Sequence, residues 1–307
     1  MNIVLIFYKI LSVKRKRNEM QNIILNNGES MPLLGFGTFQ ITDADLCRQC
    51  VTEAIESGYR LFDTATSYGN EEAIGEAISK AVSNGIVARE ELCLATKVWI
   101  QDTGYEATME AFQLSLKKMR LDYLDLYLIH QPFGDYYGSW RAMEDLVRDG
   151  RVKSIGVSNF ASDRLVDLCF HSQIKPAVNQ IEIHPFLCQK SELNIMKEYG
   201  VQPMAWGPLA EGQHNIFKHP VLAKIARKYG KSESQIVLRW HMQRGIIAIP
   251  KTVHKKRMSE NMDIWDFELN NRDIQTIETL DIGHSEIIDH RSAYTAKWLN
   301  EWNIHDQ

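Results

Sequence analysis

Short apolar runs alternate along this chain with amphipathic stretches. Most of the runs are almost continuously apolar, which is typical of parallel strands that are buried on both faces. They predict strands over Pro32–Gly37, Arg60–Ala65, Leu92–Val98, Tyr123–His130, Val152–Asn159, Ala177–Ile183, Val201–Pro208 and Gly245–Lys251. Asn26, Asn27 and Gly28 lie between two apolar runs near the start of the chain and predict a hairpin there.

Helical patterns fill the gaps between the runs. They predict helices over Asp43–Ser57, Ala107–Met119, Ser139–Asp149, Asp163–Phe170, Ser191–Tyr199, Val221–Arg244, Lys256–Trp265 and Asn271–Leu280. Ser139 is a good N-cap residue, and Gly230 is expected to divide Val221–Arg244 into two short helices. Strand runs that are each followed by a helical stretch favour an α/β fold, a closed TIM barrel of eight strands and eight helices; an open doubly wound sheet is the alternative.

Composition is that of an ordinary soluble globular protein, with 44% hydrophobic and 24% charged residues among 307. The net charge of −4 comes with no obvious basic face, so nucleic-acid binding has no support. Five cysteines without framework spacing indicate a reducing compartment, and we expect a cytoplasmic protein. Cys47 and Cys50 match C-x-x-C, but they lie inside a predicted helix, which favours two ordinary helix residues over a redox pair.

The first stretch, MNIVLIFYKILSVKRKR, is unusual because its positive charges follow its apolar part. A secretory signal has the opposite order, and the apolar part is too short to span a bilayer as a helix. A membrane-surface anchor or a nucleic-acid arm is the alternative to a simple extension. We expect residues 1–20 to be an extension outside the fold, with Met20 as the effective beginning, and residues 21–307 to form a single barrel domain.

Polar residues close three of the predicted strands. Asp63 ends LFD, Lys97 closes LCLATKV, and His130 closes YLDLYLIH, while Tyr68 follows Asp63 in the adjoining loop. The carboxyl ends of barrel strands form the face on which barrel enzymes do their chemistry. We therefore expect Asp63, Tyr68, Lys97 and His130 to form one site.

These four groups suit proton donation to a carbonyl oxygen. A phenol is a poor acid at neutral pH, and a neighbouring ammonium such as that of Lys97 is expected to lower the pKa of Tyr68. The Asp63 carboxylate would keep Lys97 charged and oriented, and the His130 imidazole can hydrogen-bond a substrate carbonyl. No nucleophile elbow or metal-binding pattern is present, so hydride from a nicotinamide is the expected nucleophile.

A dinucleotide would have to bind without the usual glycine-rich loop, because no G-x-G-x-x-G opens a strand–turn–helix unit. The segment IPKTVHKKRMSEN instead ends a strand and enters a helix, so Lys251, Thr252 and Arg257 are candidates for binding a phosphate. The candidates for the rest of the cofactor are the following: Glu260 and Asn261 for an adenine edge, Ser158, Asn159 and Gln180 for a carboxamide, and Trp206 for stacking on a flat ring.

Taken together, the motifs resemble the aldo-keto reductase superfamily. They run in the order GFGTFQ, GYRLFDTATSYGNEEAIGEAI, LATKVW, DLYLIHQP, GVSNF, NQIEIHP and IPKTVHKKRMSEN, between about Ile23 and Leu299. The resemblance implies a barrel whose bottom is closed by an N-terminal hairpin, and an NADPH-dependent reductase of small aldehydes and ketones. The short segment QPFGDYYGSW, HQP and AWGPL are similar to a prokaryotic branch that includes diketogluconate and glyoxal reductases. The C-terminal segment HSEIIDHRSAYTAKWLNEW resembles the family's tail, which implies that it folds over the pocket.

Position by position, the resemblance assigns roles to individual residues. It makes Asp63, Tyr68, Lys97 and His130 the catalytic tetrad, with Tyr68 as the general acid. It adds Thr38, Asp63 and Leu209 to the cofactor residues already named, and it implies that Lys251 and Arg257 face the ribose phosphate. The substrate positions that it implies are Phe39, Trp99, His130 and Gln131.

Two other functions stay open from the residues alone. Lys97 could be the nucleophile of a Schiff-base lyase, although pairing with Asp63 would keep its amine protonated. A barrel that binds NADPH as a sensor without turnover is the second. The expected partner is a small carbonyl substrate, with no nucleic acid and no membrane; a monomer is favoured over a dimer.

Overall fold

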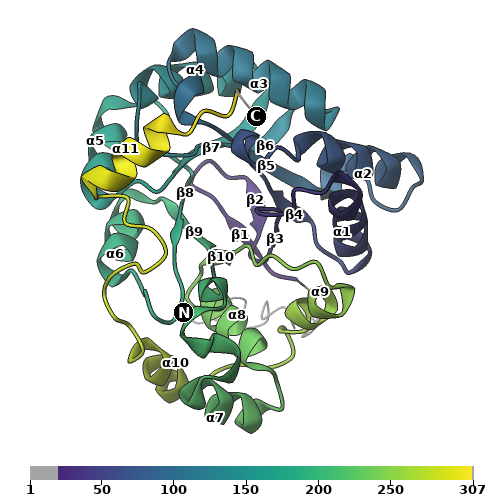
Figure 1. The fold of residues 1–307 in the computed structure, drawn as a ribbon, viewed down its shortest axis with the longest axis vertical. Helices are drawn as coiled ribbons and strands as arrows, with labels where there is room; N and C mark the ends of the chain where they lie inside the picture. Colours follow the sequence, from purple (N-terminus) through teal and green to yellow (C-terminus); the bar gives the residue numbers. More distant parts are fainter. Residues whose placement is uncertain (1–19, 306–307) are drawn as a thin grey trace, which may run out of the picture.

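Eight parallel strands lie side by side in sequence order in the computed structural model, which describes residues 20–305 (Figure 1). They are β3 (Phe36–Gly37), β4 (Leu61–Asp63), β5 (Cys93–Val98), β6 (Leu124–Ile129), β7 (Val152–Ser158), β8 (Val178–Glu182), β9 (Gln202–Trp206) and β10 (Ile247–Ala248). The ring closes where the amides of Gly35 and Ala248 donate to the carbonyls of Ala248 and Leu33, at 2.8 and 2.9 Å. The closed barrel is therefore confirmed, and the open sheet is excluded.

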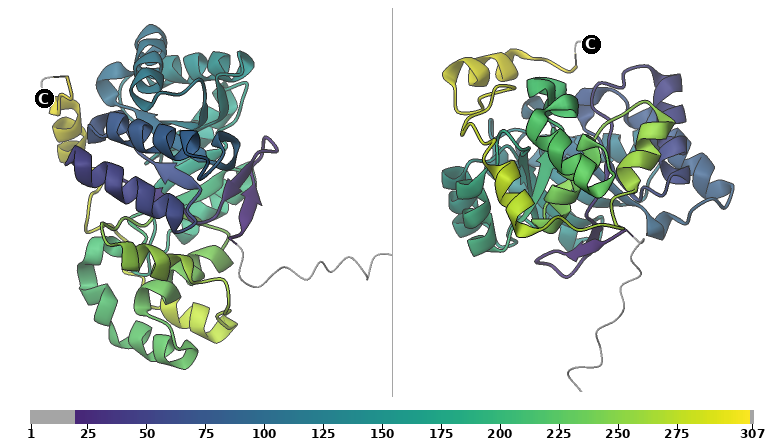
Figure 2. Two further views of the ribbon diagram at one scale, coloured as in Figure 1. Left: turned by 90° about the vertical axis from the view of Figure 1, so that its right-hand side faces the viewer. Right: turned by 90° about the horizontal axis from the view of Figure 1, so that it is seen from below.

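Helices surround the barrel, and two further elements cover its ends. The helices are α1 (Ala44–Glu56), α2 (Glu71–Ser83), α3 (Tyr105–Met119), α4 (Tyr136–Arg148), α5 (Ser162–His171), α6 (Lys190–Tyr199), α7 (Pro220–Tyr229), α8 (Glu233–Gln243), α9 (Lys255–Met262), α10 (Asn271–Glu278) and α11 (Ala293–Glu301). The antiparallel hairpin of β1 (Asn22–Ile24) and β2 (Ser30–Pro32) lies at one end of the barrel, and α11 lies at the other (Figure 2).

Local sequence signals placed most elements correctly. Gly230, at φ +64°, ends α7, and Ser232 caps α8, so the predicted division of Val221–Arg244 is confirmed. The predicted cap at Ser139 is wrong: α4 begins at Tyr136, and the Asp135 carboxylate accepts the Gly138 amide at 2.8 Å. Helices α2 and α11 were not among the predicted ranges.

The predictions for the start of the chain and for the cysteines have different outcomes. The predicted extension over residues 1–20 lies outside the described residues, Met20 excepted. Cys47 and Cys50 are buried within α1, and burial raises the pKa of the Cys47 thiol to about 12, so the pair is not a redox motif. Within residues 20–305, none of the helices has the length and apolarity needed to cross a membrane.

The barrel and its helices pack too closely in places for larger side chains. Gly75 lies in the middle of α2, and a Cβ atom there would meet the Met119 backbone of α3 at 2.5 Å. Glycine is unfavourable inside a helix by about 1 kcal/mol relative to alanine. Its presence in α2 is explained by the close approach of α2 and α3, because real Cβ contacts are longer than this.

We expect Gly75→Ala to lower the free energy of unfolding by about 2 kcal/mol, because overpacking outweighs the gain in helix propensity. Urea unfolding followed by circular dichroism measures the change. Ser79→Ala is the matched control: Ser79 is exposed on the same helix, so this change should be neutral or slightly stabilising. A Gly75→Ala protein as stable as the parent would show that α2 and α3 are not held at this separation by Gly75.

Candidate active site

The predicted tetrad assembles at the carboxyl ends of neighbouring strands. Asp63 ends β4, Lys97 is the next-to-last residue of β5, and His130 directly follows β6. Parallel pairing places Asp63 opposite Ala95 and Lys97 opposite Leu128, so successive strands deliver these side chains to the same end of the barrel. Tyr68 reaches the same place from a short 3-10 helix, Thr66–Tyr68, after β4. The structure thus brings together all four residues that the sequence predicted.

Lys97 is the centre of this site. Its side chain is fully buried, and its ammonium donates to Asp63 Oδ1 at 2.6 Å, to the Thr64 carbonyl at 2.8 Å and to the Tyr68 hydroxyl at 3.5 Å. Burial lowers the pKa of Lys97, and the Asp63 carboxylate opposes that shift. The three N–H groups are all engaged, which leaves no free amine for the Schiff-base chemistry considered above.

Further polar contacts fix Asp63. The Gln180 amide donates to Asp63 Oδ2 at 2.8 Å, so each carboxylate oxygen has a partner. The Thr38 hydroxyl donates to the Asp63 backbone carbonyl at 2.9 Å. Thr38 and Gln180, two predicted cofactor residues, therefore lie directly against the tetrad and position Asp63 in this structure.

Tyr68 keeps its proton in this environment. Burial raises the pKa of Tyr68 well above the ordinary value of 10.0, and the Asp63 and Glu211 carboxylates raise it further. The expectation that Lys97 would give Tyr68 a lowered pKa is therefore wrong for this structure, because burial and the two carboxylates raise the pKa. A protonated phenol is the form that a proton donor requires.

His130 is buried and uncharged beside Tyr68. Burial lowers its pKa well below 6.5, and the nearby Lys97 and His290 lower it further. The two rings meet edge to face with centroids 5.6 Å apart, and His130 Nδ1 lies 3.3 Å from the Ser67 hydroxyl. A neutral imidazole in this place can hydrogen-bond a carbonyl oxygen without adding a charge to the site.

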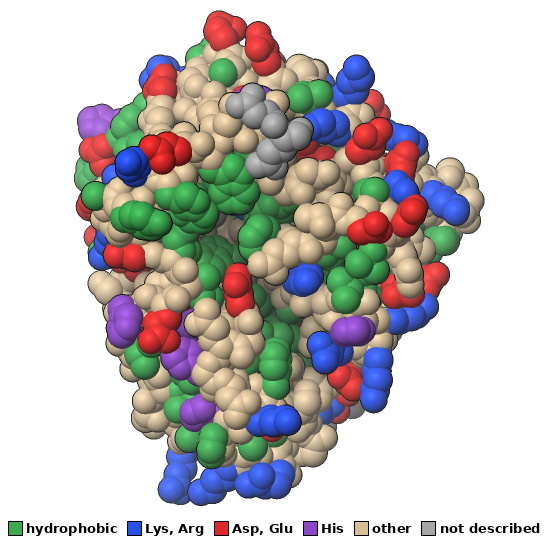
Figure 3. Space-filling model, in the orientation of Figure 1, with side chains coloured by type: hydrophobic (Ala, Val, Ile, Leu, Met, Phe, Trp, Pro, Cys, Tyr) green, Lys and Arg blue, Asp and Glu red, His purple; other side chains and the backbone are tan. Residues whose placement is uncertain are grey.

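Two of the predicted substrate residues, Phe39 and Trp99, lie against the same two rings. Phe39 is 42% exposed, and its ring lies 4.9 Å from that of Tyr68. Trp99 is buried, and its ring lies 5.0 Å from that of His130. Gln131 is buried as well, and its amide oxygen lies 3.4 Å from the Asn159 amide. Figure 3 shows hydrophobic side chains gathered around a hollow over the barrel.

A chain of amide contacts continues from His130 to the next strands. The Asn159 amide donates to the His130 carbonyl at 3.1 Å, and the Trp206 indole N–H donates to the Asn159 side-chain oxygen at 2.8 Å. Asn159 adopts the left-handed conformation, with φ 63°, directly after β7. Ser158 donates to the Gln180 carbonyl at 3.0 Å. The predicted carboxamide and stacking residues therefore adjoin the tetrad.

The predicted phosphate residues lie at the start of α9. Lys251 and Arg257 are exposed, and among the described residues neither has an ion-pair partner. Thr252 is buried between them, and its hydroxyl accepts the His254 amide at 3.2 Å. Two unpaired cations at a helix N-terminus fit a phosphate group, since both favour an anion.

The remaining predicted cofactor residues differ in how far they are buried. Asn261 is buried beside the Tyr59 hydroxyl, Glu260 lies on the exposed face of α9 near Lys256, and Leu209 packs partly buried against the core. In the part of the chain that the structure describes, no group of histidine, cysteine or acidic side chains is arranged to hold a metal ion.

Several residues at the site were not predicted from the sequence. The buried Asn70 amide donates to the carbonyls of Thr38 and Ile41 and ties together the loops after β3 and β4. Ser67 contacts His130, as described above. Trp302 lies edge to face on Trp99 at 5.4 Å, although about two hundred residues separate them. Ser67 and Asn70 lie within the motif that predicted Tyr68. The resemblance implied that the C-terminal segment folds over the pocket, but no local signal connects Trp302 with Trp99.

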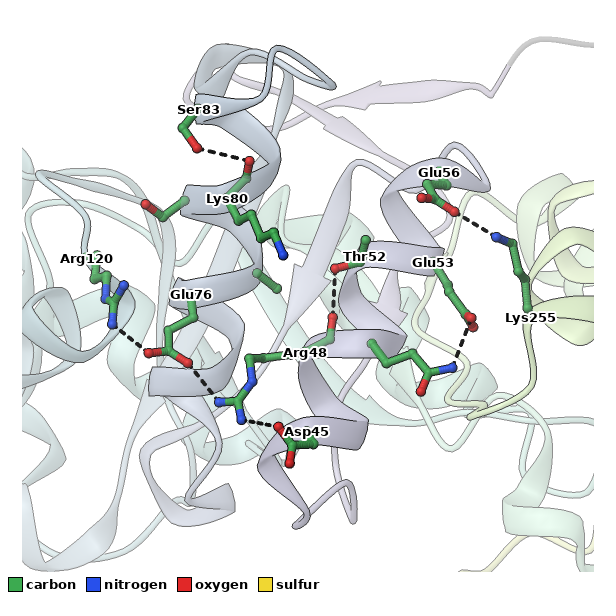
Figure 4. A pocket seen from close by; sticks show the side chains of 13 residues that line it. Asp45, Arg48, Thr52, Glu53, Glu56, Glu76, Lys80, Ser83, Arg120 and Lys255 are labelled. Carbon is green, nitrogen blue, oxygen red and sulfur yellow. Dashed lines mark hydrogen bonds and ion pairs between the residues drawn. The ribbon is translucent and has the colours of Figure 1, made fainter.

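A groove of about 800 Å³ lies outside the barrel, along α1 and α2 (Figure 4). Arg48 bridges Asp45 and Glu76 there, and Lys255 pairs with Glu56 across the groove. Mutually paired charges of this kind are typical of a solvated seam between helices. The groove contains none of the predicted site residues.

Comparison with known proteins agrees with this geometry. Residues 33–282 match the family model of the aldo/keto reductase family. The chain is 46% identical to a glyoxal reductase of Bacillus subtilis, over 83% of this chain and 91% of that relative, and 41% identical to a methylglyoxal reductase of Escherichia coli, over 85% and 94%. It superposes on an aldo-keto reductase of Bombyx mori in complex with NADP with a TM-score of 0.84 at 37% identity, over 88% and 95% of the two chains.

We expect Lys97→Met to lower the free energy of unfolding by about 3–5 kcal/mol, because it leaves the buried Asp63 carboxylate without its cation. The double variant Asp63→Asn/Lys97→Met should be more stable than Lys97→Met alone, since a neutral amide can still accept from Gln180. Urea unfolding of the parent, of Asp63→Asn, of Lys97→Met and of the double variant gives the comparison. Losses that simply add in the double variant would contradict the pairing described here.

Proposed function

The chain belongs to the aldo/keto reductase family, and from this membership and the geometry of the site we propose that Tyr68 is the general acid of an NADPH-dependent reduction of small aldehydes and ketones to alcohols. The observation that carries the proposal is the contact of a protonated Tyr68 with the buried Lys97 ammonium and with His130. NADPH, when bound, supplies a hydride to the carbonyl carbon.

The residues of the chain handle the proton that accompanies this reduction. The carbonyl oxygen accepts hydrogen bonds from the Tyr68 hydroxyl and the neutral His130 ring. As negative charge develops on the oxygen, the O–H bond of Tyr68 breaks and a new O–H bond forms on the substrate, which becomes the alcohol. The phenolate left on Tyr68 is stabilised by the ammonium of Lys97, 3.5 Å away, and Asp63 holds Lys97 in place.

Two groups of residues would hold the cofactor, one next to the tetrad and one at the start of α9. Lys251 and Arg257 would bind its ribose phosphate, and Thr252 would adjoin that group. The carboxamide of the nicotinamide would meet the amides of Asn159 and Gln180, and Trp206 would stack on its ring. Support for these roles comes from their positions: Asn159 follows β7, Trp206 ends β9, and Gln180 contacts Asp63 from within β8. Lys251 and Thr252 precede α9, and Arg257 lies in its first turn.

We also propose a domain organisation, an oligomeric state, a location and a substrate size for the protein. Residues 21–307 act as one functional barrel unit, and the protein works as a monomer in the cytoplasm. The carbonyl substrate is small, as the names of the glyoxal and methylglyoxal reductases suggest.

We expect Tyr68→Phe to lower kcat for methylglyoxal by about a hundredfold to ten-thousandfold, because it removes the proton donor and little else. NADPH oxidation followed at 340 nm gives kcat, and quenching of tryptophan fluorescence gives the dissociation constant for NADPH, which should change by less than about threefold. Phe39→Leu is the control, since it alters the ring beside Tyr68 but keeps the hydroxyl. Full turnover by Tyr68→Phe would show that another group donates the proton.

Neutralising the phosphate residues should separate the two nicotinamide cofactors. We expect Lys251→Ala and Arg257→Ala each to weaken NADPH binding by about tenfold or more, because each removes a charge-assisted contact, and to leave NADH binding within about twofold. Lys256→Ala is the matched control, because Lys256 is an exposed cation on the same helix that pairs with Glu260. Equal losses for NADPH and NADH would show that these residues do not bind the ribose phosphate.

A further inference from the structure

The carboxyl end of the barrel strands, where the tetrad lies, is the mouth of the barrel. Beside His130, rings from two segments that are distant in sequence form one wall of this mouth. Trp99, after β5, packs on His130, and Trp302, after α11, packs edge to face on Trp99 at 5.4 Å. Trp298 of α11 stacks on Trp302 at 5.8 Å. Phe133 and Ile288 pack against the same buried group. The wall is therefore almost wholly aromatic and aliphatic.

Two hydrogen-bond donors in this wall, those of Trp99 and Gln101, are engaged by the C-terminal segment. The Trp99 indole N–H donates to the Trp302 carbonyl at 3.1 Å, and the Gln101 amide donates to the same oxygen at 2.8 Å. Gln101 also accepts the Ile304 amide at 3.1 Å. An indole N–H next to His130 is the natural donor for an oxygen on the far part of a substrate. Here that donor fixes the C-terminal segment instead.

Cations near the wall are engaged as well. In the described part of the chain, two basic side chains lie over rings of the mouth: Lys97 over Tyr68 at 5.0 Å and Arg164 over Phe133 at 5.6 Å. Lys97 is fully buried against Asp63, and Arg164 donates to the Pro132 carbonyl. His130 is uncharged. The exposed cations of α9 belong to the proposed phosphate site.

We infer that this mouth selects uncharged carbonyl compounds and rejects those that carry a carboxylate, and that Trp302 determines this selection. A carboxylate placed against the wall would lose its water without gaining a cation, and that loss is large. The inference rests on the proposed function and narrows its substrate class. It distinguishes reductases of neutral aldehydes from reductases of sugar acids and oxo acids.

Three aldehydes with the same reacting group test the selection: methyl 4-formylbenzoate, 4-formylbenzamide and 4-carboxybenzaldehyde, assayed with NADPH at pH 7.5. We expect kcat/KM for the ester and the amide to exceed that for the acid by at least tenfold. The amide controls for polarity, because it is polar but uncharged. An acid reduced as well as the amide would overturn the inference and leave the proposed function intact, whereas no turnover of any aldehyde would count against the proposed function itself.

Two matched variants test the role of Trp302. Trp302→Arg and Trp302→Gln both remove the ring and keep the backbone carbonyl that accepts from Trp99, but only the first adds a cation. We expect the preference for amide over acid to shrink at least fivefold more in Trp302→Arg than in Trp302→Gln. The same preference in both would remove Trp302 from the inference. Trp298→Arg and Trp298→Gln, at a position 45% exposed, give the same comparison should the Trp302 variants fail to fold.

Discussion

The buried ion pair between Lys97 and Asp63 is the interaction on which the site depends. Removing two charges from water is costly, and the cost is offset only when every polar atom of the pair has a partner. Here the partners are the Thr64 carbonyl and the Tyr68 hydroxyl, from the segment after β4, and the Gln180 amide, from the middle of β8. A slip of one residue in the register of β4 or β5 would turn these side chains away from the pair and leave the charges unpaired. The barrel geometry and the catalytic geometry are thus a single constraint.

This constraint explains why the sequence was informative about the tetrad. A polar residue that ends an apolar strand run, as Asp63, Lys97 and His130 do, has to lie at the barrel mouth, because parallel strands bring their carboxyl ends to one edge. The chain order of the strands equals their spatial order, so no long-range pairing had to be guessed. Tyr68 follows Asp63 closely enough that the same local argument places it.

Features that depend on distant contacts or on the total environment could not be predicted in this way. The C-terminal segment meets Trp99 through Trp302, a pairing that no periodicity or motif encodes. Burial, Asp63 and Glu211 raise the pKa of Tyr68, and only the assembled site shows that these influences prevail. The start of α4 was misplaced because Asp135 and Ser139 are both good cap residues, and the contacts of the folded chain select Asp135.

The charge of the assembled site connects its chemistry with its choice of substrate. Lys97 and Asp63 cancel, Tyr68 is protonated and His130 is neutral, so the catalytic groups carry no net charge before reaction. The charge that develops on the substrate oxygen is then stabilised by one ammonium, through the Tyr68 hydroxyl. A second negative charge on the substrate would be placed beside this developing charge in a low-dielectric wall of Trp99 and Trp302, where like charges interact strongly. The arrangement that lets a half-buried phenol donate its proton is therefore also one that disfavours an acidic substrate.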